Sequence, residues 1–145
     1  MEPDYFKNYL QDYVRNHGFG DAAALSDKVL DNADLAKKEY DDCLNAGYDG
    51  MGALELALRT LFIGIGDSSM EAADYFLEDT FIHIVPEFEN SEVYDEWVRK
   101  VAENEEIWKD YRIENGLGLD KELLETNRYE IIGSIDQFLK ENGIQ

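Results

Sequence analysis

The stretch ALELALRTLFIGIGDSSMEAADYFLEDTFIHIVP, residues 53–86, decides the fold. Its first part is apolar on nearly every side, which predicts a buried central helix that ends at Gly64 and Gly66. Ser68 and Glu71 then have the spacing of a capping box, which predicts the start of the next helix. Apolar residues recur along that helix at helical spacing, so we expect it to run until Pro86. Its expected core-facing residues are Met70, Ala73, Leu77, Phe81 and Ile84.

Helical periodicity extends in both directions from this stretch. The other expected helices cover residues 5–14, 21–44 or 26–44, 91–101, 107–111 and 120–139. Ser91 and Asp120 are the expected N-caps of the fifth and last helices, and Gly47 and Gly143 are expected to end the second and last. No alternating run of strand length stands out. The pattern therefore predicts an all-α fold, a single compact bundle of six or seven helices in one domain over residues 1–145.

The charge balance is the most unusual property of the composition. The chain has 145 residues, and 33 Asp and Glu against 13 Lys and Arg give a net charge of −20. Such a charge disfavours direct binding to nucleic acid or to an anionic membrane, because phosphate recognition needs cations. The single cysteine suits a reducing compartment, and the N-terminus MEPDYFKNYL lacks the pattern of a signal peptide. We therefore expect a cytoplasmic protein with no membrane-spanning segment.

The acidic side chains are concentrated in one part of the sequence. Residues 60–98, 39 in all, contain no lysine or arginine. Asp74 and Glu78 are a like-charge pair one helical turn apart, which costs about 0.2–0.5 kcal/mol unless a cation from elsewhere in the fold lies nearby. We therefore predict an acidic surface that binds a basic protein partner, and a mimic of nucleic acid is one form of this hypothesis. Its ten candidate residues are Asp67, Glu71, Asp74, Glu78, Asp79, Glu87, Glu89, Glu92, Asp95 and Glu96.

Motifs for catalysis, metals and cofactors are missing from the sequence. His17 and His83 are isolated, and there is no Glu-x-x-His, no His-Glu-x-x-His and no pair of cysteines. We therefore expect no catalytic residues, no metal site and no cofactor, and a protein that is not an enzyme. Asp41 and Asp42 beside Cys43 are expected to raise the pKa of its thiol, which favours a buried structural role. Tyr48, in the loop after Gly47, is the candidate for an exposed aromatic residue.

Two other functions remain open from the sequence. Because 33 carboxylates are available and nothing selects two of them, a small-molecule-binding or carboxylate-based catalytic helical bundle is an alternative. A homodimer that buries the aromatic helices is another, since Trp97, Trp108, Tyr94 and Tyr111 are residue types enriched at interfaces.

The chain also resembles a known family. The likeness covers roughly residues 27–88, and less of the tail RYEIIGSIDQFLKENGIQ. Its matching features are Ala46-Gly47-Tyr48, the run Ala53–Ala57, Gly64 and Val85-Pro86-Glu87. They resemble a domain-of-unknown-function family of short, acidic helical proteins of Bacteroides-type bacteria, often found on conjugative elements. The sequence departs from the family pattern after Gly64, where it reads GDSSME instead of a His and a Lys-Tyr-Asp, and near Glu78, where the family has a Trp. The resemblance implies an all-α cytoplasmic protein of a mobile element, and no mechanism.

Overall fold

The computed structural model describes residues 2–144, and they form two compact units. The first unit comprises residues 1–65 and 114–117, and the second comprises residues 66–113 and 118–145. Each unit has its own hydrophobic core. The units are therefore described one at a time.

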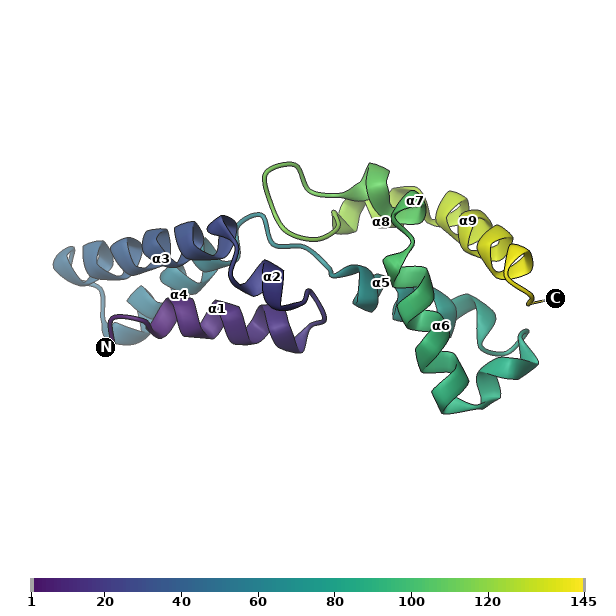
Figure 1. The fold of residues 1–145 in the computed structure, drawn as a ribbon. Helices are drawn as coiled ribbons and strands as arrows, with labels where there is room; N and C mark the ends of the chain where they lie inside the picture. The colour runs from purple at the N-terminus through teal and green to yellow at the C-terminus, as the bar shows by residue number, and fades with distance from the viewer. Residues whose placement is uncertain (1, 145) are drawn as a thin grey trace. The chain divides into compact units, whose positions relative to one another are not determined.

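Helices built from the N-terminal half make up the first unit (Figure 1). They are α1 (Tyr5–Asn16), α2 (Asp21–Ala24), α3 (Asp27–Asn45) and α4 (Gly50–Leu61). Ser26 caps α3 by accepting a hydrogen bond from the Val29 N–H, and Asp49 caps α4 in the same way through Gly52 N–H. α3 packs against both α1 and α4. Gly47 has a φ of 98°, the left-handed conformation that ends a helix at little cost in glycine.

The core of the first unit lies between α1, α3 and α4. Phe6, Leu10 and Val14 contribute from α1, at the four-residue spacing of one helix face. Asn32 is 2% exposed within this core, and its side-chain amide donates to the carbonyls of Leu61 and Ile63 at 2.9 and 2.8 Å. Leu61 is the last residue of α4 and Ile63 lies two residues beyond it, so neither carbonyl has an acceptor role within the helix. Asn32 provides the hydrogen-bond donor for both.

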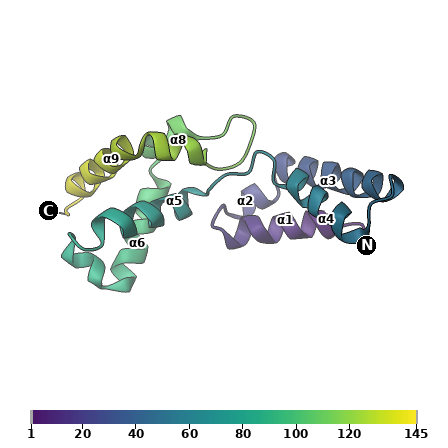
Figure 2. The same ribbon diagram turned by 180° about the vertical axis from the view of Figure 1, so that it is seen from behind.

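Helices of the second unit follow in two runs along the chain (Figure 2). The first run is α5 (Ser69–Phe76), η1 (Leu77–Phe81), η2 (Pro86–Glu89), α6 (Ser91–Glu103), α7 (Glu105–Trp108) and η3 (Lys109–Tyr111). The second run is α8 (Lys121–Thr126) and α9 (Arg128–Glu141). α6 packs against α5, and α9 contacts both α7 and α8. Trp108 is fully buried in the core of this unit, where its indole N–H donates to the Val101 carbonyl at 2.9 Å.

The segment η1 is a π-helix that continues α5. The Ile82 N–H donates to the Leu77 carbonyl at 2.9 Å, five residues earlier instead of four. The wider turn shifts the core-facing position by one residue, so Val85 is 5% exposed and Ile84 is 65% exposed. The predictions that Ile84 faces the core and that one regular helix runs until Pro86 are therefore wrong.

Gly66 allows a close approach of two backbone segments in the second unit. Asp67 and Leu119 exchange hydrogen bonds of 3.1 and 2.7 Å between their N–H and carbonyl groups. A Cβ atom on Gly66 would lie 2.0 Å from the Leu119 carbonyl oxygen, which leaves no space for any side chain. The glycine is therefore required by this backbone pairing, and the pairing places the residues before α5 beside the start of α8.

The predicted all-α class is confirmed, and residues 2–144 contain no β-strand. The capping box at Ser68 and Glu71, the cap at Asp120 and the end of α9 before Gly143 are also confirmed. That the whole chain forms one domain stays a prediction.

Other details of the predicted helices are corrected. The residues described contain more helical segments than six or seven, because short elements such as α2 and α7 are separate. Asn90, not Ser91, caps α6 by accepting from the N–H groups of Glu92 and Val93. The predicted last helix is broken at Asn127 into α8 and α9. α4 starts at Gly50 and buries only Ala53, Ala57 and Leu61, so it is not apolar and buried on every side.

Candidate functional site

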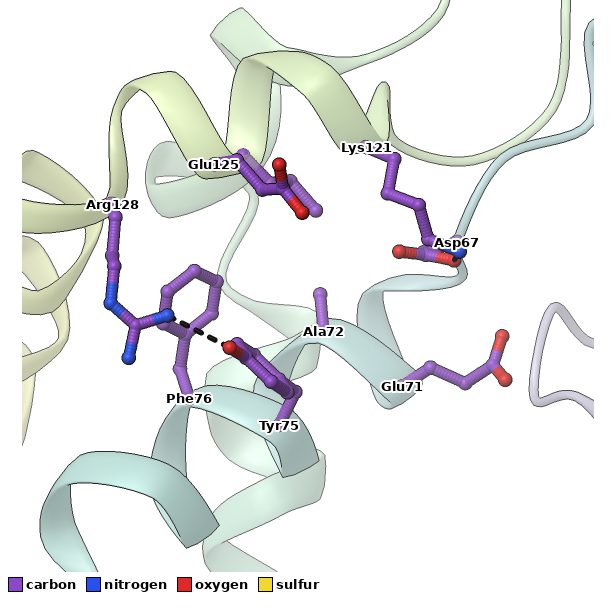
Figure 3. A pocket seen from close by; sticks show the side chains of 9 residues that line it. Asp67, Glu71, Ala72, Tyr75, Phe76, Lys121, Glu125 and Arg128 are labelled. Atoms are coloured by element: carbon purple, nitrogen blue, oxygen red, sulfur yellow. Dashed lines mark hydrogen bonds and ion pairs between the residues drawn. The ribbon is translucent and has the colours of Figure 1, made fainter.

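A cavity lies between α5 and α8 in the second unit. We call it the α5–α8 pocket; its volume is about 320 Å³. Figure 3 shows how the side chains lie around it. The lining residues are Asp67, Glu71, Ala72, Tyr75, Phe76, Lys121, Leu124, Glu125 and Arg128. Its volume is at the lower end of the range of small-molecule sites, which is about 300–1,000 Å³.

Local folding rules explain how the pocket is built. The capping box fixes the first turn of α5, and Ala72 and Phe76 then lie one turn apart on its buried face. Leu124 is the buried residue of α8, a helix whose start is fixed by the Asp120 cap. Ala72, Phe76 and Leu124 are 4%, 2% and 6% exposed, so they form an apolar floor.

Arg128, the first residue of α9, is fixed on one side of the pocket. Its guanidinium donates to the Tyr75 hydroxyl at 2.8 Å and forms an ion pair with Asp79. The guanidinium carbon also lies 5.6 Å from the centre of the Tyr75 ring and 5.9 Å from that of Phe76, within the range of cation–π contacts. The hydrogen bond to Tyr75 and the charge of Asp79 raise the pKa of Arg128 above its usual value. This wall of the pocket therefore already holds one guanidinium through a carboxylate and two aromatic rings.

The remaining charged groups of the pocket differ in their pairing. Lys121 lies 3.7 Å from Asp67, in a pair in which the lysine side chain is 76% exposed. Glu71 accepts a hydrogen bond from the Ser68 N–H at 3.3 Å and is directed away from Arg128 (Figure 3). The carboxylate of Glu125 has no hydrogen bond or ion pair with any residue from 2 to 144. Glu125 is therefore the lining carboxylate whose charge the described residues do not compensate.

A second hollow adjoins the first at Tyr75, which lines both. Its volume is about 470 Å³, and its other lining residues are Glu78, Asp79, Ile82 and His83. Glu78 and Asp79 belong to the π-helix η1, and segments of this kind are frequent at functional sites. His83 is exposed here beside two carboxylates.

The ten predicted acidic residues all lie in the second unit, and the structure divides them into three with ion pairs, one in the capping box and six others. Asp67 and Asp79 pair with Lys121 and Arg128, which come from a distant part of the sequence, and Glu96 pairs with its neighbours Arg99 and Lys100 at 3.9 and 3.6 Å. Glu71 belongs to the capping box. The other six, which we call the open acidic surface, have no ion pair with residues 2–144; they are Asp74, Glu78, Glu87, Glu89, Glu92 and Asp95.

Three members of the open acidic surface lie around the hydroxyl of Tyr94. This hydroxyl donates to the Asp74 carboxylate at 2.7 Å and to its carbonyl at 3.1 Å. Burial, this hydrogen bond and the charges of Asp74, Glu78 and Asp95 raise the pKa of Tyr94 well above its usual value. Asp74 and Glu78, the like-charge pair of the sequence, are therefore stabilised by a neutral donor at Asp74 and not by a cation.

A comparison with models of protein families covers nearly the whole chain. Residues 1–144 match a family described as a domain of unknown function, DUF1896. The chain belongs to this family. No curated protein and no solved structure matches it. The match extends well beyond the roughly 60 residues on which the resemblance in sequence was based.

Other candidate residues lie apart from these sites. Tyr48 is 52% exposed in the first unit, as predicted for its loop. His17 follows α1 and stacks on Tyr13, with ring centres 3.9 Å apart. Cys43 is 7% exposed, and burial together with a hydrogen bond to Glu39 raises the pKa of its thiol. The predicted direction of this shift is confirmed, although burial and Glu39 are its main causes.

Two further observations concern metal binding and membrane spanning. Within residues 2–144, no group of three or more His, Cys, Asp or Glu side chains is placed to hold a metal ion. No helix in the same range has the length and apolar character needed to cross a bilayer.

Among the lining residues of the pocket, the sequence analysis named Asp67 and Glu71 as candidates and missed the others. Tyr75, Lys121, Glu125 and Arg128 are of ordinary types at ordinary helical positions, and no motif includes them. Arg128 is 49 residues from Asp79 along the chain, so only the fold brings them together.

Proposed function

We propose that this chain is a non-enzymatic interaction module that binds a basic segment of a protein partner through the open acidic surface. The observation that carries this proposal is the distribution of charge between the units. The second unit has 20 acidic and seven basic residues, a net −13, whereas the first has 13 and six, a net −7. Six exposed or half-exposed carboxylates of the second unit are available to cations of a partner, because none of the described residues forms an ion pair with them.

Lysine and arginine are the groups that this surface recognises best. Complementary charge steers a basic partner to the surface and raises its association rate. Because exposed charge pairs are screened by salt, the complex is expected to weaken strongly between about 0.1 and 0.5 M salt.

The test uses a variant of the surface and a matched control with the same change of charge. The variant is Glu87→Gln, Glu92→Gln, Asp95→Asn; the control is Asp12→Asn, Asp31→Asn, Asp34→Asn in the first unit. All six side chains are exposed. Proteins captured by the wild type and the control at low salt should be released at high salt and should not be captured by the variant. Equal capture by variant and control would contradict the proposal.

The partner class and cellular setting are further parts of this proposal. We propose that the partner is a nucleic-acid-binding protein, whose cationic surface the carboxylates occupy in place of phosphates, and that the protein acts in the cytoplasm as an accessory of a conjugative element. The excess of acidic residues and the resemblance to a family of short acidic proteins often found on conjugative elements support this. Duplex DNA added to a captured complex should displace the chain from its partner; lack of competition would contradict the mimicry.

A second candidate function is the binding of a small molecule. The α5–α8 pocket, with its apolar floor and charged rim, favours it. Catalysis by a pair of carboxylates has less support, because the pocket's Asp67 is already paired with Lys121 and Glu71 belongs to the capping box.

A further inference from the structure

We propose that the α5–α8 pocket holds one long basic side chain of the partner, an arginine or a lysine, with its terminal cation at Glu125. This inference rests on the proposed function and assigns the pocket a part in it. The pocket shares Tyr75 with the second hollow, which is lined by Glu78 of the open acidic surface.

The charges around the pocket favour a cation. Its lining residues include three carboxylates and two cations, and the two cations are paired with Asp67 and Asp79. An anionic ligand would have to displace one of these pairs and would face the net charge of −13 of the unit. A cationic ligand meets Glu125 without displacing any described residue.

The shape of the pocket favours a cation with an apolar stem. Lysine and arginine bury their methylene groups along apolar surface while their charged ends stay in contact with water or a carboxylate. Ala72, Phe76 and Leu124 provide the apolar surface, and Figure 3 shows the Glu125 carboxylate extending from α8 on the opposite side from Ala72. A basic side chain that enters between α5 and α8 would therefore meet apolar contact along its stem and the carboxylate at its end.

Arg128 demonstrates that the wall of this pocket binds a guanidinium. Its contacts with Tyr75, Phe76 and Asp79 come from the same chain and are of the type that a partner's arginine would make. Tyr75 is 52% exposed, so part of its ring surface remains accessible to a second group.

The experiment measures binding of a fluorescein-labelled hexa-arginine peptide to the full chain by anisotropy. Glu125→Gln is compared with Glu122→Gln, which removes the same charge from the same helix outside the pocket. We expect Glu125→Gln to weaken binding at least fivefold and Glu122→Gln less than twofold. Ala72→Leu, which fills the floor, should weaken binding to a similar degree, and a thermal melt followed by circular dichroism verifies that each variant is folded.

The outcomes separate this inference from the proposed function. Equal effects of Glu125→Gln and Glu122→Gln, with loss of binding in the Glu87, Glu92 and Asp95 variant, would contradict the role of the pocket. The role of the open acidic surface would then be supported. Loss of peptide binding only with Glu125→Gln would support the role of the pocket and contradict the role of the open acidic surface. If the wild type binds no peptide at low salt, both proposals fail. Binding of spermidine in place of the peptide, with the same dependence on Glu125, would overturn the assignment to a protein side chain.

Discussion

The acidic stretch of the second unit and the helices of the first unit differ in how their charge is compensated. In the first unit, ion pairs are mostly one helical turn apart, as in Lys37–Asp41, Lys38–Asp42 and Glu55–Arg59. In the second unit, the acidic stretch carries no cation of its own, and Lys121 and Arg128 reach it from α8 and α9. Local pairing follows from the helical spacing of the sequence, whereas pairing over about 50 residues depends on the tertiary fold.

This difference separates charge that is compensated within its own helix from charge that is compensated by distant residues or has no ion pair. Exposed pairs at one turn contribute only about 0.3–0.5 kcal/mol each, so they add little to the stability of the first unit. Within the acidic stretch, the second unit leaves six carboxylates without an ion pair to residues 2–144, at a cost in self-repulsion. Its larger core, with both tryptophans, offsets that cost.

The largest effect is expected at the backbone pairing that closes the second unit. Gly66→Ala places a Cβ against the Leu119 carbonyl at 2.0 Å and should lower the free energy of unfolding by more than about 2 kcal/mol. Because Trp97 and Trp108 lie in this unit, their fluorescence during urea unfolding measures the loss directly. Gly133→Ala is the control: its Cβ would meet nothing within 4 Å, and the exchange in the interior of α9 should stabilise by about 0.5–1 kcal/mol. Comparable stability of Gly66→Ala and wild type would show that the segments are not held in this register.

A change in the first unit tests whether the two cores are independent. Asn32→Leu removes both hydrogen bonds to the end of α4 and leaves the Leu61 and Ile63 carbonyls unsatisfied, at a cost of about 1–3 kcal/mol. Circular dichroism, which records the helices of both units, should show an earlier transition. Tryptophan fluorescence, which reports only on the second unit, should keep its midpoint. A parallel shift of the two signals would show that the units unfold as one domain, as the sequence predicted.

Helix capping offers a smaller and more local test. Asn90→Ala should lower stability by about 1 kcal/mol, because Asn90 accepts from two N–H groups at the start of α6. Ser91→Ala should change it by less than about 0.5 kcal/mol, since Ser91 is the first helical residue and not the cap. Urea unfolding of the two variants decides between them. A larger loss of stability with Ser91→Ala would show that Ser91 is the N-cap of α6, as the sequence predicted.

The features that the sequence predicted are those set within one turn of helix. The capping box at Ser68, the cap at Asp120 and the left-handed Gly47 depend on neighbours a few residues away, and all three are confirmed. The break at Asn127 had no such signal, because no glycine or proline marks it; there the Asn127 amide donates to the Leu123 carbonyl and ends α8.

The parts that could not be predicted depend on contacts between distant segments. The π-helix has no distinctive residues. Its shift of one position leaves Ile84 exposed and Val85 buried, whereas regular helical spacing predicted that Ile84 faces the core. The pocket forms where α5, α8 and the start of α9 meet. Glu125 becomes a candidate residue only because the fold places it beside the apolar floor of the pocket. The acidic stretch was visible as composition, but only the fold shows which of its carboxylates are paired.

The smallest effect concerns one ion pair from each unit. Arg112 binds Glu105 through two hydrogen bonds of 2.7 Å, and this interaction lowers the pKa of Glu105 below its usual value. A lowered pKa in the folded state stabilises the protein above the unfolded pKa of about 4.3, and this contribution is lost as the pH falls through the folded value. Glu105→Gln should therefore cost less than about 1 kcal/mol at pH 7, because the pair is largely exposed, and nothing once wild-type Glu105 is protonated.

Asp42→Asn in the first unit is the matched comparison, since it removes a single hydrogen bond of 2.7 Å from Lys38. Its cost at pH 7 should be smaller than that of Glu105→Gln, because a guanidinium that binds both carboxylate oxygens is held in a more defined geometry than an ammonium on a flexible stem. Urea unfolding at pH 7 and pH 3 provides both differences. Equal costs for the two variants, or a Glu105→Gln cost that does not decrease from pH 7 to pH 3, would show that the Glu105–Arg112 pair contributes no more through its charge than the Lys38–Asp42 pair.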